Sequence, residues 1–283
     1  MTRLTKKSLF ATIVLLALFL TVLLRNEPKL QTPLINMEIE NAVPKNTTII
    51  SNVPIIKDEL KDNVTKGNYI LQGNIVIPEG KTVQVEPDTV FYANRDAKIT
   101  VHGKLIANNV TWQSNQAYNQ RRYWYGLTAE NNGEINLENC QIQDATTAVT
   151  TLNGGKATIS GVFTNNVVGV SVLEKGKVKI QNLQINEGTV GILTLGGNTA
   201  INNATFTGLT DGLRIFHDSM ISINKPTFTR IQRNTVRYLA EPNITITNII
   251  DNSASSPTQI FDGKNQPTHL WQGKEYKTGI VSI

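Results

Sequence analysis

Short runs of alternating apolar and polar residues fill most of the chain after residue 66, and between residues 133 and 242 they recur every 21 to 23 residues. Alignment of five such repeats superimposes three apolar columns. Successive side chains of a β-strand point to opposite faces, so each column marks a short strand with one apolar face. The first column holds Leu137, Ile159, Ile180, Ile201 and Ile223; the second holds Ile142, Phe163, Ile185, Phe206 and Phe228; the third holds Val149, Val170, Ile192, Leu213 and Val236.

One repeat cannot bury three apolar faces alone, but stacked repeats enclose a common interior. Each turn of such a stack adds one strand to each of three sheets, about 4.8 Å from the previous strand. We therefore predict an all-β fold, a parallel β-helix solenoid with three sheets and about nine coils between residues 66 and 260. A β-sandwich and a propeller are the alternatives, but the hairpin dipeptides that they favour are scarce here.

The amino-terminal segment has a different pattern. The apolar run "SLFATIVLLALFLTVLL", residues 8–24, follows the basic residues Arg3, Lys6 and Lys7 of the segment 1–7. Its length is at the short end of the range that spans a bilayer, and no small-residue cleavage site follows it. We predict an uncleaved transmembrane signal anchor with residues 1–7 in the cytoplasm and the rest of the chain exported. A cleaved signal peptide and a buried core helix are the alternatives.

The segments on either side of the repeats are predicted as caps. Residues 25–65 are polar and contain several prolines, which is typical of a stalk that leads into an N-terminal cap, with one short helical turn at "IIKDELK". Residues 261–283 are predicted to cover the last coil, with Trp271 as an anchor. If the solenoid ends are open instead, the chain has an assembly role in which coils of different molecules stack.

Composition narrows the possible partners. The formal net charge is +5, and part of it lies in the first seven residues, so the remainder is too weakly basic to indicate nucleic-acid binding. Cys140 is the single cysteine, which excludes an intramolecular disulfide and a cysteine-based metal cluster. Its place beside the second column predicts a buried small side chain. His102 and His217 are several coils apart, so we expect no metal site and no cofactor.

The first coils also resemble a known family. Its opening pattern G-x-T-V-x-V-x-P-G-T, I-x-V-x-G-x-L-x-A and W-x-G is matched, with Asp88 in place of the glycine after the proline. The matching residues are Gly80, Thr82, Val83, Val85, Pro87 and Thr89, then Ile99, Val101, Gly103, Leu105 and Ala107, then Trp124 and Gly126. The chain thus resembles the right-handed parallel β-helix, pectin-lyase-like family of secreted bacterial proteins. The resemblance implies the fold, whereas the family includes lyases, hydrolases, epimerases, adhesins and structural proteins.

The spacing of carboxylates on neighbouring coils bears on catalysis, because polysaccharide-active enzymes on this scaffold need carboxylates close together. Two residues after the second column, the repeats place Asp144, Asn165, Glu187, Gly208 and Arg230 in one column. Asp144 and Glu187 are two coils apart, about 9.6 Å, which is too far for a retaining pair. We interpret this column as solvated turn residues.

The segment "TDGLRIFHDS", residues 210–219, departs most from the repeat and carries the candidate catalytic residues Asp211, Arg214 and His217. Asp211 occupies the position of Val168 and Val190, and Asn234 takes this position on the next coil, so a residue that marks the turn before the strand is the alternative interpretation.

Two further groups are candidate ligand-binding residues. Arg214 and Arg237 follow the third column by one position, so both are predicted to point outward on adjacent coils, near Arg230 and Arg233. Such a basic patch suits an anionic glycan, a phosphate or a lipid headgroup; a solvated basic face is the alternative. Tyr123 and Tyr125 are candidates for stacking on sugars, whereas Trp124 is predicted to pack inside.

From these observations we predict a membrane-anchored extracytoplasmic β-helix, periplasmic or at the cell surface, that acts without catalysis as a scaffold or glycan-binding module. Its expected partners are anionic or cell-envelope polysaccharide or another envelope protein, with the membrane contacted through residues 8–24 and no nucleic acid bound. The alternative is a polysaccharide lyase, glycoside hydrolase or epimerase that acts on the outer wall of the β-helix.

Overall fold

The structure is a computed structural model that describes residues 53–116, 120–216, 218–238, 243–247, 250–252, 258–261, 267–271 and 280–282. These residues form 20 β-strands. The first ten are β1 (Ile55–Glu59), β2 (Asn68–Ile77), β3 (Thr82–Val85), β4 (Val90–Ala93), β5 (Lys98–Val101), β6 (Lys104–Asn108), β7 (Thr111–Ser114), β8 (Gly126–Ala129), β9 (Glu134–Gln143) and β10 (Thr147–Thr151). The others are β11 (Lys156–Val172), β12 (Lys177–Thr194), β13 (Asn198–Ile215), β14 (Met220–Thr229), β15 (Asn234–Tyr238), β16 (Asn243–Thr247), β17 (Ile250–Asp251), β18 (Thr258–Phe261), β19 (Pro267–Trp271) and β20 (Ile280–Ser282).

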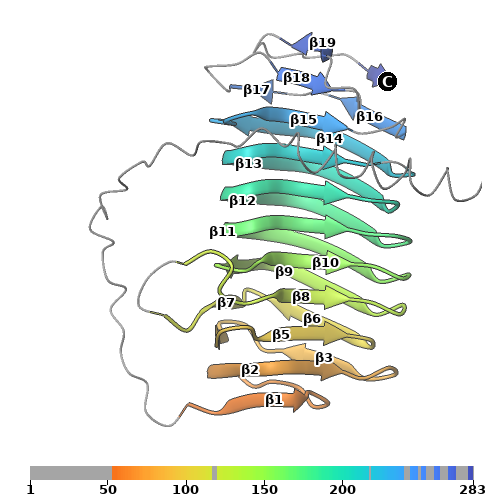
Figure 1. Ribbon diagram of the computed structural model, residues 1–283. Helices are drawn as coiled ribbons and strands as arrows, with labels where there is room; N and C mark the ends of the chain where they lie inside the picture. The colour runs from red at the N-terminus through yellow and green to blue at the C-terminus, as the bar shows by residue number, and fades with distance from the viewer. Residues whose placement is uncertain are drawn as a thin grey trace, which may run out of the picture. The chain divides into compact units, whose positions relative to one another are not determined.

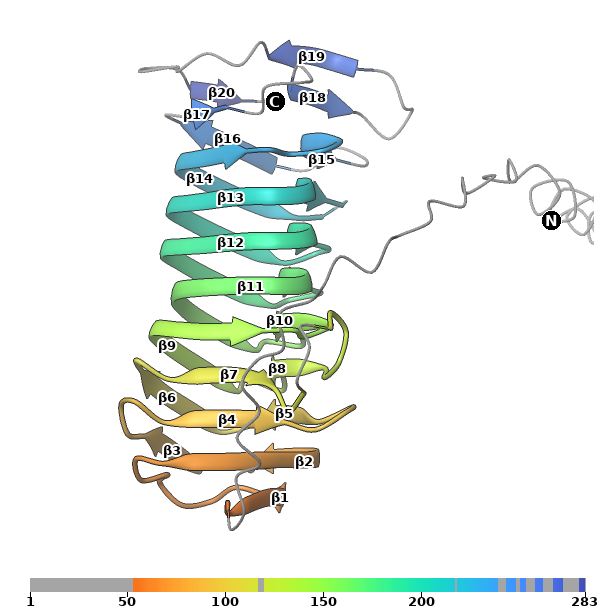
Figure 2. The ribbon, with the colours of Figure 1, turned by 90° about the vertical axis from the view of Figure 1, so that its left-hand side faces the viewer.

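Parallel pairing winds these strands into a solenoid with three sheets, here called walls 1, 2 and 3 (Figure 1 and Figure 2). Wall 1 contains β3, β6, the first parts of β9, β11, β12, β13 and β14, and β16. Wall 2 contains the first part of β2, β4, β7, the ends of β9 and β14, the middle parts of β11, β12 and β13, and β17. Wall 3 contains the end of β2, β5, β8, β10, the ends of β11, β12 and β13, and β15.

The predicted three-sheet parallel β-helix is confirmed, with about eight turns in the described residues instead of about nine. The last predicted turn is not completed as a parallel coil, because β18 pairs with β19 in an antiparallel hairpin. Another antiparallel strand, β20, pairs with β16 at the end of wall 1.

The three predicted columns are confirmed by the strand register, and their members are buried. Ile180 lies between Ile159 and Ile201 on wall 1. The second and third columns follow the same rule on walls 2 and 3. Within the second column the Phe206 and Phe228 rings stack with centroids 4.8 Å apart, so the aromatic residues of successive turns pack directly on each other.

Single residues with a left-handed backbone turn the chain between walls. At the corner between walls 1 and 2 these residues are Asp88, Asn109, Asn139, Gly161, Asn182, Asn203 and Lys225. Asparagine, aspartate and glycine tolerate this conformation best, which explains their abundance at the corners. Asp88, which replaces the family's usual glycine, adopts it with a φ of 62°, so the turn is retained.

The segment 55–61 differs from its prediction, because "IIKDELK" begins with strand β1 and not with a helical turn. β1 pairs with β2 in parallel, and Ile56 and Leu60 pack against the core. Pairing with the solenoid edge therefore outweighs the weak helical preference of this segment. The described part of the chain contains no helix that is long and apolar enough to cross a membrane, and the predicted anchor at residues 8–24 lies outside it.

Candidate functional site

The candidate residue Asp211 lies where the wall-3 part of β13 begins. The register places Asp211 next to Val190 of the previous turn and Asn234 of the following one, as the repeat alignment predicts. The structure also brings Arg214 and Arg233 to this position. The third candidate catalytic residue, His217, lies outside the described residues.

The Asp211 carboxylate is fully buried and accepts hydrogen bonds on both oxygens. Arg233 donates twice, from Nη2 to Oδ2 at 2.7 Å and from Nε to Oδ1 at 3.0 Å. Arg214 Nε donates to Oδ2 at 2.5 Å, and Asn234 Nδ2 donates to Oδ1 at 2.9 Å. The two-pronged contact from Arg233 is the strongest common geometry between arginine and a carboxylate.

These contacts determine the charge of the cluster. Burial by itself raises the pKa of Asp211, but the hydrogen bonds from Arg233, Arg214 and Asn234 outweigh it and lower that pKa below its usual value. The hydrogen bond with Asp211 in turn raises the pKa of Arg233. Asp211 therefore stays ionised near neutral pH, with both oxygens occupied.

This geometry matches a structural ion cluster more closely than a general acid or base. A catalytic carboxylate needs access to the substrate and a pKa near the working pH, whereas Asp211 is buried and its pKa is lowered. Within the residues that the structure covers, no group of three or more histidine, cysteine, aspartate or glutamate side chains is arranged to hold a metal ion.

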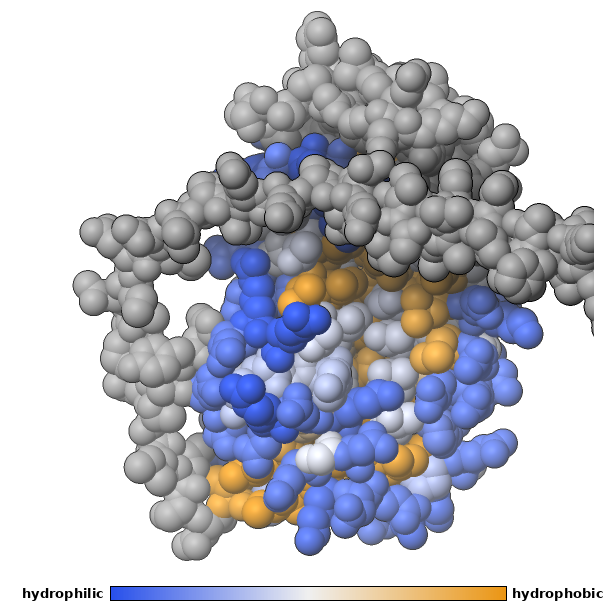
Figure 3. Space-filling model, viewed as in Figure 1, coloured by the Kyte–Doolittle hydropathy of each residue, from blue (hydrophilic) through white to orange (hydrophobic). Residues whose placement is uncertain are grey.

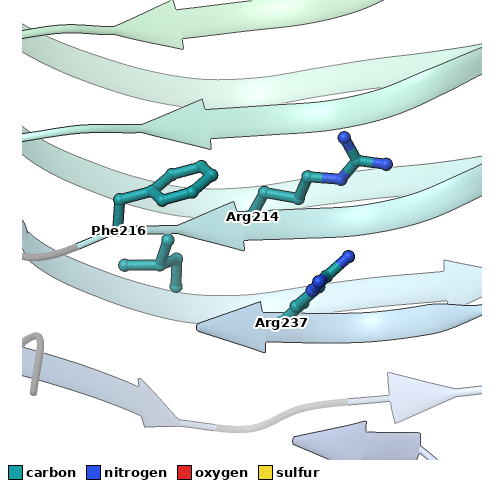
Figure 4. Close-up of a pocket in the computed structure, with 4 residues that line it drawn as sticks. Arg214, Phe216 and Arg237 are labelled. Atoms are coloured by element: carbon teal, nitrogen blue, oxygen red, sulfur yellow. The ribbon is translucent and has the colours of Figure 1, made fainter. Parts of the chain in front are cut away.

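Arg214 and Arg237 lie on adjacent turns of wall 3, as predicted, and are paired in register. Figure 4 shows both side chains extending to the same side of the sheet, with the Phe216 ring beside Arg214. Together with Ile215 they line a pocket of about 90 Å³. Arg237 forms no hydrogen bond or ion pair with any described residue, so its guanidinium group is available to a ligand.

The other two candidate arginines differ in their surroundings. Arg233 is half exposed and pairs with Asp211. Arg230 is an exposed corner residue, and Gly208 and Glu187 occupy the same corner on the two preceding turns. The Arg230 Nη2 atom lies 3.7 Å from the position that a Cβ on Gly208 would occupy. We call Arg214, Arg230, Arg233 and Arg237 the basic surface. Four arginines against the single Asp211 give this cluster a net positive charge.

The visible face of wall 3 is more polar at its borders than between them. Figure 3, which looks onto this wall, shows blue side chains along its borders and both pale and orange ones between them. The column that ends in Arg214 and Arg237 begins with Glu59 and Val76. It continues through Thr100, Thr128, Thr150, Ser171 and Leu193. The positive charge of this column is thus concentrated in its last two positions.

The predicted aromatic cluster divides into buried and exposed members. Trp124 is buried and donates from Nε1 to the Gln143 carbonyl oxygen at 2.8 Å, which confirms its packing role. Tyr123 lies under Arg95, with the guanidinium carbon 5.5 Å from the ring centroid. Tyr125 is 51% exposed. Tyr125 is therefore the most exposed of these three aromatic side chains.

A second polar cluster surrounds Asp144, and it corrects the prediction of a solvated turn residue. Asp144 does lie at a corner in the left-handed conformation, but it is fully buried. Ser114 Oγ donates to its Oδ2 at 2.6 Å, and Asn165 Nδ2 donates to its Oδ1 at 2.7 Å. Arg121 Nε donates to Asn165 Oδ1 at 2.8 Å. The repeat alignment missed Ser114 because the long connection between β7 and β8 interrupts the period.

Cys140 is buried, as predicted, and burial raises the pKa of its thiol to about 11. The thiolate is the reactive form of cysteine, so this shift removes Cys140 from the candidate nucleophiles near neutral pH.

Comparison with known proteins agrees with this architecture. Residues 125–269, just over half of the 283-residue chain, match the family model described as the right handed beta helix region. No curated protein sequence matches the chain.

Proposed function

This chain belongs to the right-handed β-helix family, and on that premise we propose that it is a membrane-anchored extracytoplasmic β-helix that binds acidic polysaccharide of the cell envelope without cleaving it. The basic surface on wall 3 is the binding site. The observation that carries this proposal is the pair of in-register arginines, Arg214 and Arg237, beside the Phe216 ring (Figure 4).

The chemistry of this pair favours a ligand with regularly spaced carboxylates. Arg214 already contacts Asp211, whereas the Arg237 side chain, on the neighbouring strand about 4.8 Å away, has no ion-pair partner among the described residues. The unneutralised charge of the pair therefore attracts a further anion. Guanidinium groups bind carboxylates through paired hydrogen bonds. Phe216 adds an apolar surface next to them, which suits the C–H face of a sugar ring. A uronic acid unit combines both features.

The carboxylates of the same region support binding without catalysis. Asp211 and Asp144 are fully buried and hydrogen-bonded, and the exposed Glu187 faces Gly208 on the next turn. A glycosidase needs two accessible carboxyl groups at a defined separation. The anchor predicted for residues 8–24 supports an envelope location, in which the ligand is a surface polysaccharide.

The test uses the full-length chain in detergent micelles with polygalacturonate and alginate as probes. We expect both to bind, and binding to weaken with added salt because charges are paired at an exposed surface. Arg237→Glu is expected to reduce affinity at least tenfold. The matched control is Lys177→Glu, an equal charge change at an exposed position of wall 1, which is expected to leave affinity within twofold.

Product formation is measured in the same mixtures through new reducing ends and unsaturated uronate absorbance. Release of shortened chains would replace the proposal with the enzyme alternative, a lyase or hydrolase. Equal loss of binding in Arg237→Glu and Lys177→Glu would instead show attraction by net charge without a site.

A further inference from the structure

A groove on wall 1, away from the basic surface, is the second feature with the properties of a binding site. We propose that it binds uncharged sugar units of a glycan chain. The groove has a volume of about 370 Å³ and crosses four successive turns, from β6 through β9 and β11 to β12. This volume lies at the lower end of the range for small-molecule sites.

The groove coincides with a break in the asparagine column at the corner between walls 1 and 2. Elsewhere in this column side chains bond from turn to turn: Asn109 Nδ2 donates to Asp88 Oδ1 at 2.5 Å, and Asn203 Nδ2 donates to Asn182 Oδ1 at 2.6 Å. The turn of β11 is one residue shorter at this corner, because Gly161 pairs with Cys140 and Leu183. Ser160 alone lies between Ile159 and Gly161, so no asparagine of β11 continues the column between Asn139 and Asn182.

The break at Gly161 is imposed by the backbone. Gly161 has a φ of 129°, which side chains with an L configuration rarely adopt, and a Cβ there would lie 2.0 Å from the Cys140 carbonyl oxygen. Any other residue would clash with the preceding turn. Asn139 and Asn182 are thus held two turns apart, about 9.6 Å along the solenoid, with Ser160 at the corner of the intervening turn.

The groups around the break are free to bind a ligand. The side chains of Asn139 and Gln181 form no hydrogen bond with any described residue. Asn182 uses its oxygen to accept from Asn203, which leaves its Nδ2 free. Ser160 Oγ accepts from the backbone N–H of Asn139 at 2.9 Å and keeps its own hydrogen to donate. Donors and acceptors therefore alternate along the groove.

This set of groups matches sugar hydroxyls. Each hydroxyl both donates and accepts, as do the side-chain amides and hydroxyls of the groove. Neither lysine nor arginine lines it, and Glu138 contributes a carboxylate, so an anionic chain is disfavoured. Ile106, half-buried among the lining residues, provides a small apolar surface for the C–H face of a sugar. The ligand class is thus an uncharged oligosaccharide.

The test measures calorimetric binding of cellotetraose, maltotetraose, laminaritetraose and chitotetraose to the full-length chain in a detergent without a sugar headgroup. We expect at least one probe to bind. The double variant Asn139→Gly with Asn182→Gly keeps the left-handed turns, because glycine adopts them readily, but removes both amides. With several hydrogen bonds lost, affinity is expected to fall at least tenfold.

The matched control is Asn109→Gly with Lys225→Gly, which changes two residues of the same corner that do not line the groove. It is expected to bind within twofold of the unmodified chain, and thermal unfolding of both double variants verifies that they fold. Failure of all four probes to bind, or equal weakening in both double variants, would overturn the groove proposal. Polygalacturonate binding is measured in parallel, and its persistence would leave the proposal for wall 3 intact.

Discussion

Asp144 and Asp211 are both fully buried carboxylates near wall 3, but the solenoid satisfies them in different ways. Among the described residues, Asp144 accepts hydrogen bonds from Ser114 and Asn165, and Arg121 donates to Asn165. Asp211 accepts hydrogen bonds from two arginines and Asn234. In these contacts the arginines bond the Asp211 carboxylate directly, whereas Arg121 bonds the asparagine beside Asp144.

The difference follows from the position of each residue in the repeat. Asp144 lies at the corner between walls 2 and 3. Asn165 occupies the same corner on the next turn, so the regular column itself supplies a neutral hydrogen-bond donor. Asp211 occupies a position that holds valine on the two preceding turns. Its in-register neighbour on the next turn, Asn234, supplies a neutral donor there too, so the two arginines are what distinguishes this cluster. A buried charge with few partners is costly. The arginines that satisfy Asp211 also form the basic surface.

The largest expected effect comes from removing both arginines around Asp211. The double variant Arg214→Ala with Arg233→Ala leaves a buried carboxylate with Asn234 as its remaining donor, and we expect the free energy of unfolding to fall by about 3–5 kcal/mol. Urea unfolding followed by tryptophan fluorescence measures it. Arg121→Ala at the Asp144 cluster is expected to cost less than about 1 kcal/mol, because Arg121 bonds the amide of Asn165. Similar losses in both variants would contradict the comparison.

A smaller effect is expected from removing the neutral donor of Asp144. Asn165→Ala is expected to lower the free energy of unfolding by about 1–3 kcal/mol more than Asn203→Ala, since it removes one hydrogen bond from the buried Asp144 carboxylate. Both asparagines have left-handed backbones, with φ values of 57° and 59°, so the strain of alanine is matched. Asn203 bonds an exposed amide instead of a carboxylate. Equal stability of the two variants would show that the bond to Asp144 contributes little.

The smallest expected effect is a difference in pH dependence. The pKa of Asp211 is lower in the folded chain than its usual value, so the unfolded chain binds the proton at a higher pH. The stabilisation from the cluster is complete above about pH 4, the usual aspartate range, and is lost as the pH falls through the folded pKa. The variant Asp211→Asn has no carboxyl group at this position and therefore lacks this pH-dependent stabilisation. Its stability should therefore decline less steeply than that of the unmodified chain between pH 5 and pH 2.5, measured by urea unfolding.

The candidate site was predictable to the extent that it follows the repeat. The alignment placed Asp211 beside Asn234 and Arg214 beside Arg237, because residues one period apart become neighbours in register. It also placed Asp144 and Asn165 in one column. The alignment did not identify Asp211 as buried or Asp144 as a cluster centre, since burial depends on side chains that fold over from other turns.

The repeat alone is enough to predict the three sheets, their register and the apolar interior, since turns of nearly equal length bring equivalent residues together. Which polar residues meet depends on the folded chain. Ser114 precedes the long connection between β7 and β8, Arg233 contacts Asp211 of the previous turn, and the shorter corner of β11 leaves the asparagine column incomplete. These contacts depend on side-chain direction and on local departures from the period, which a regular repeat does not encode.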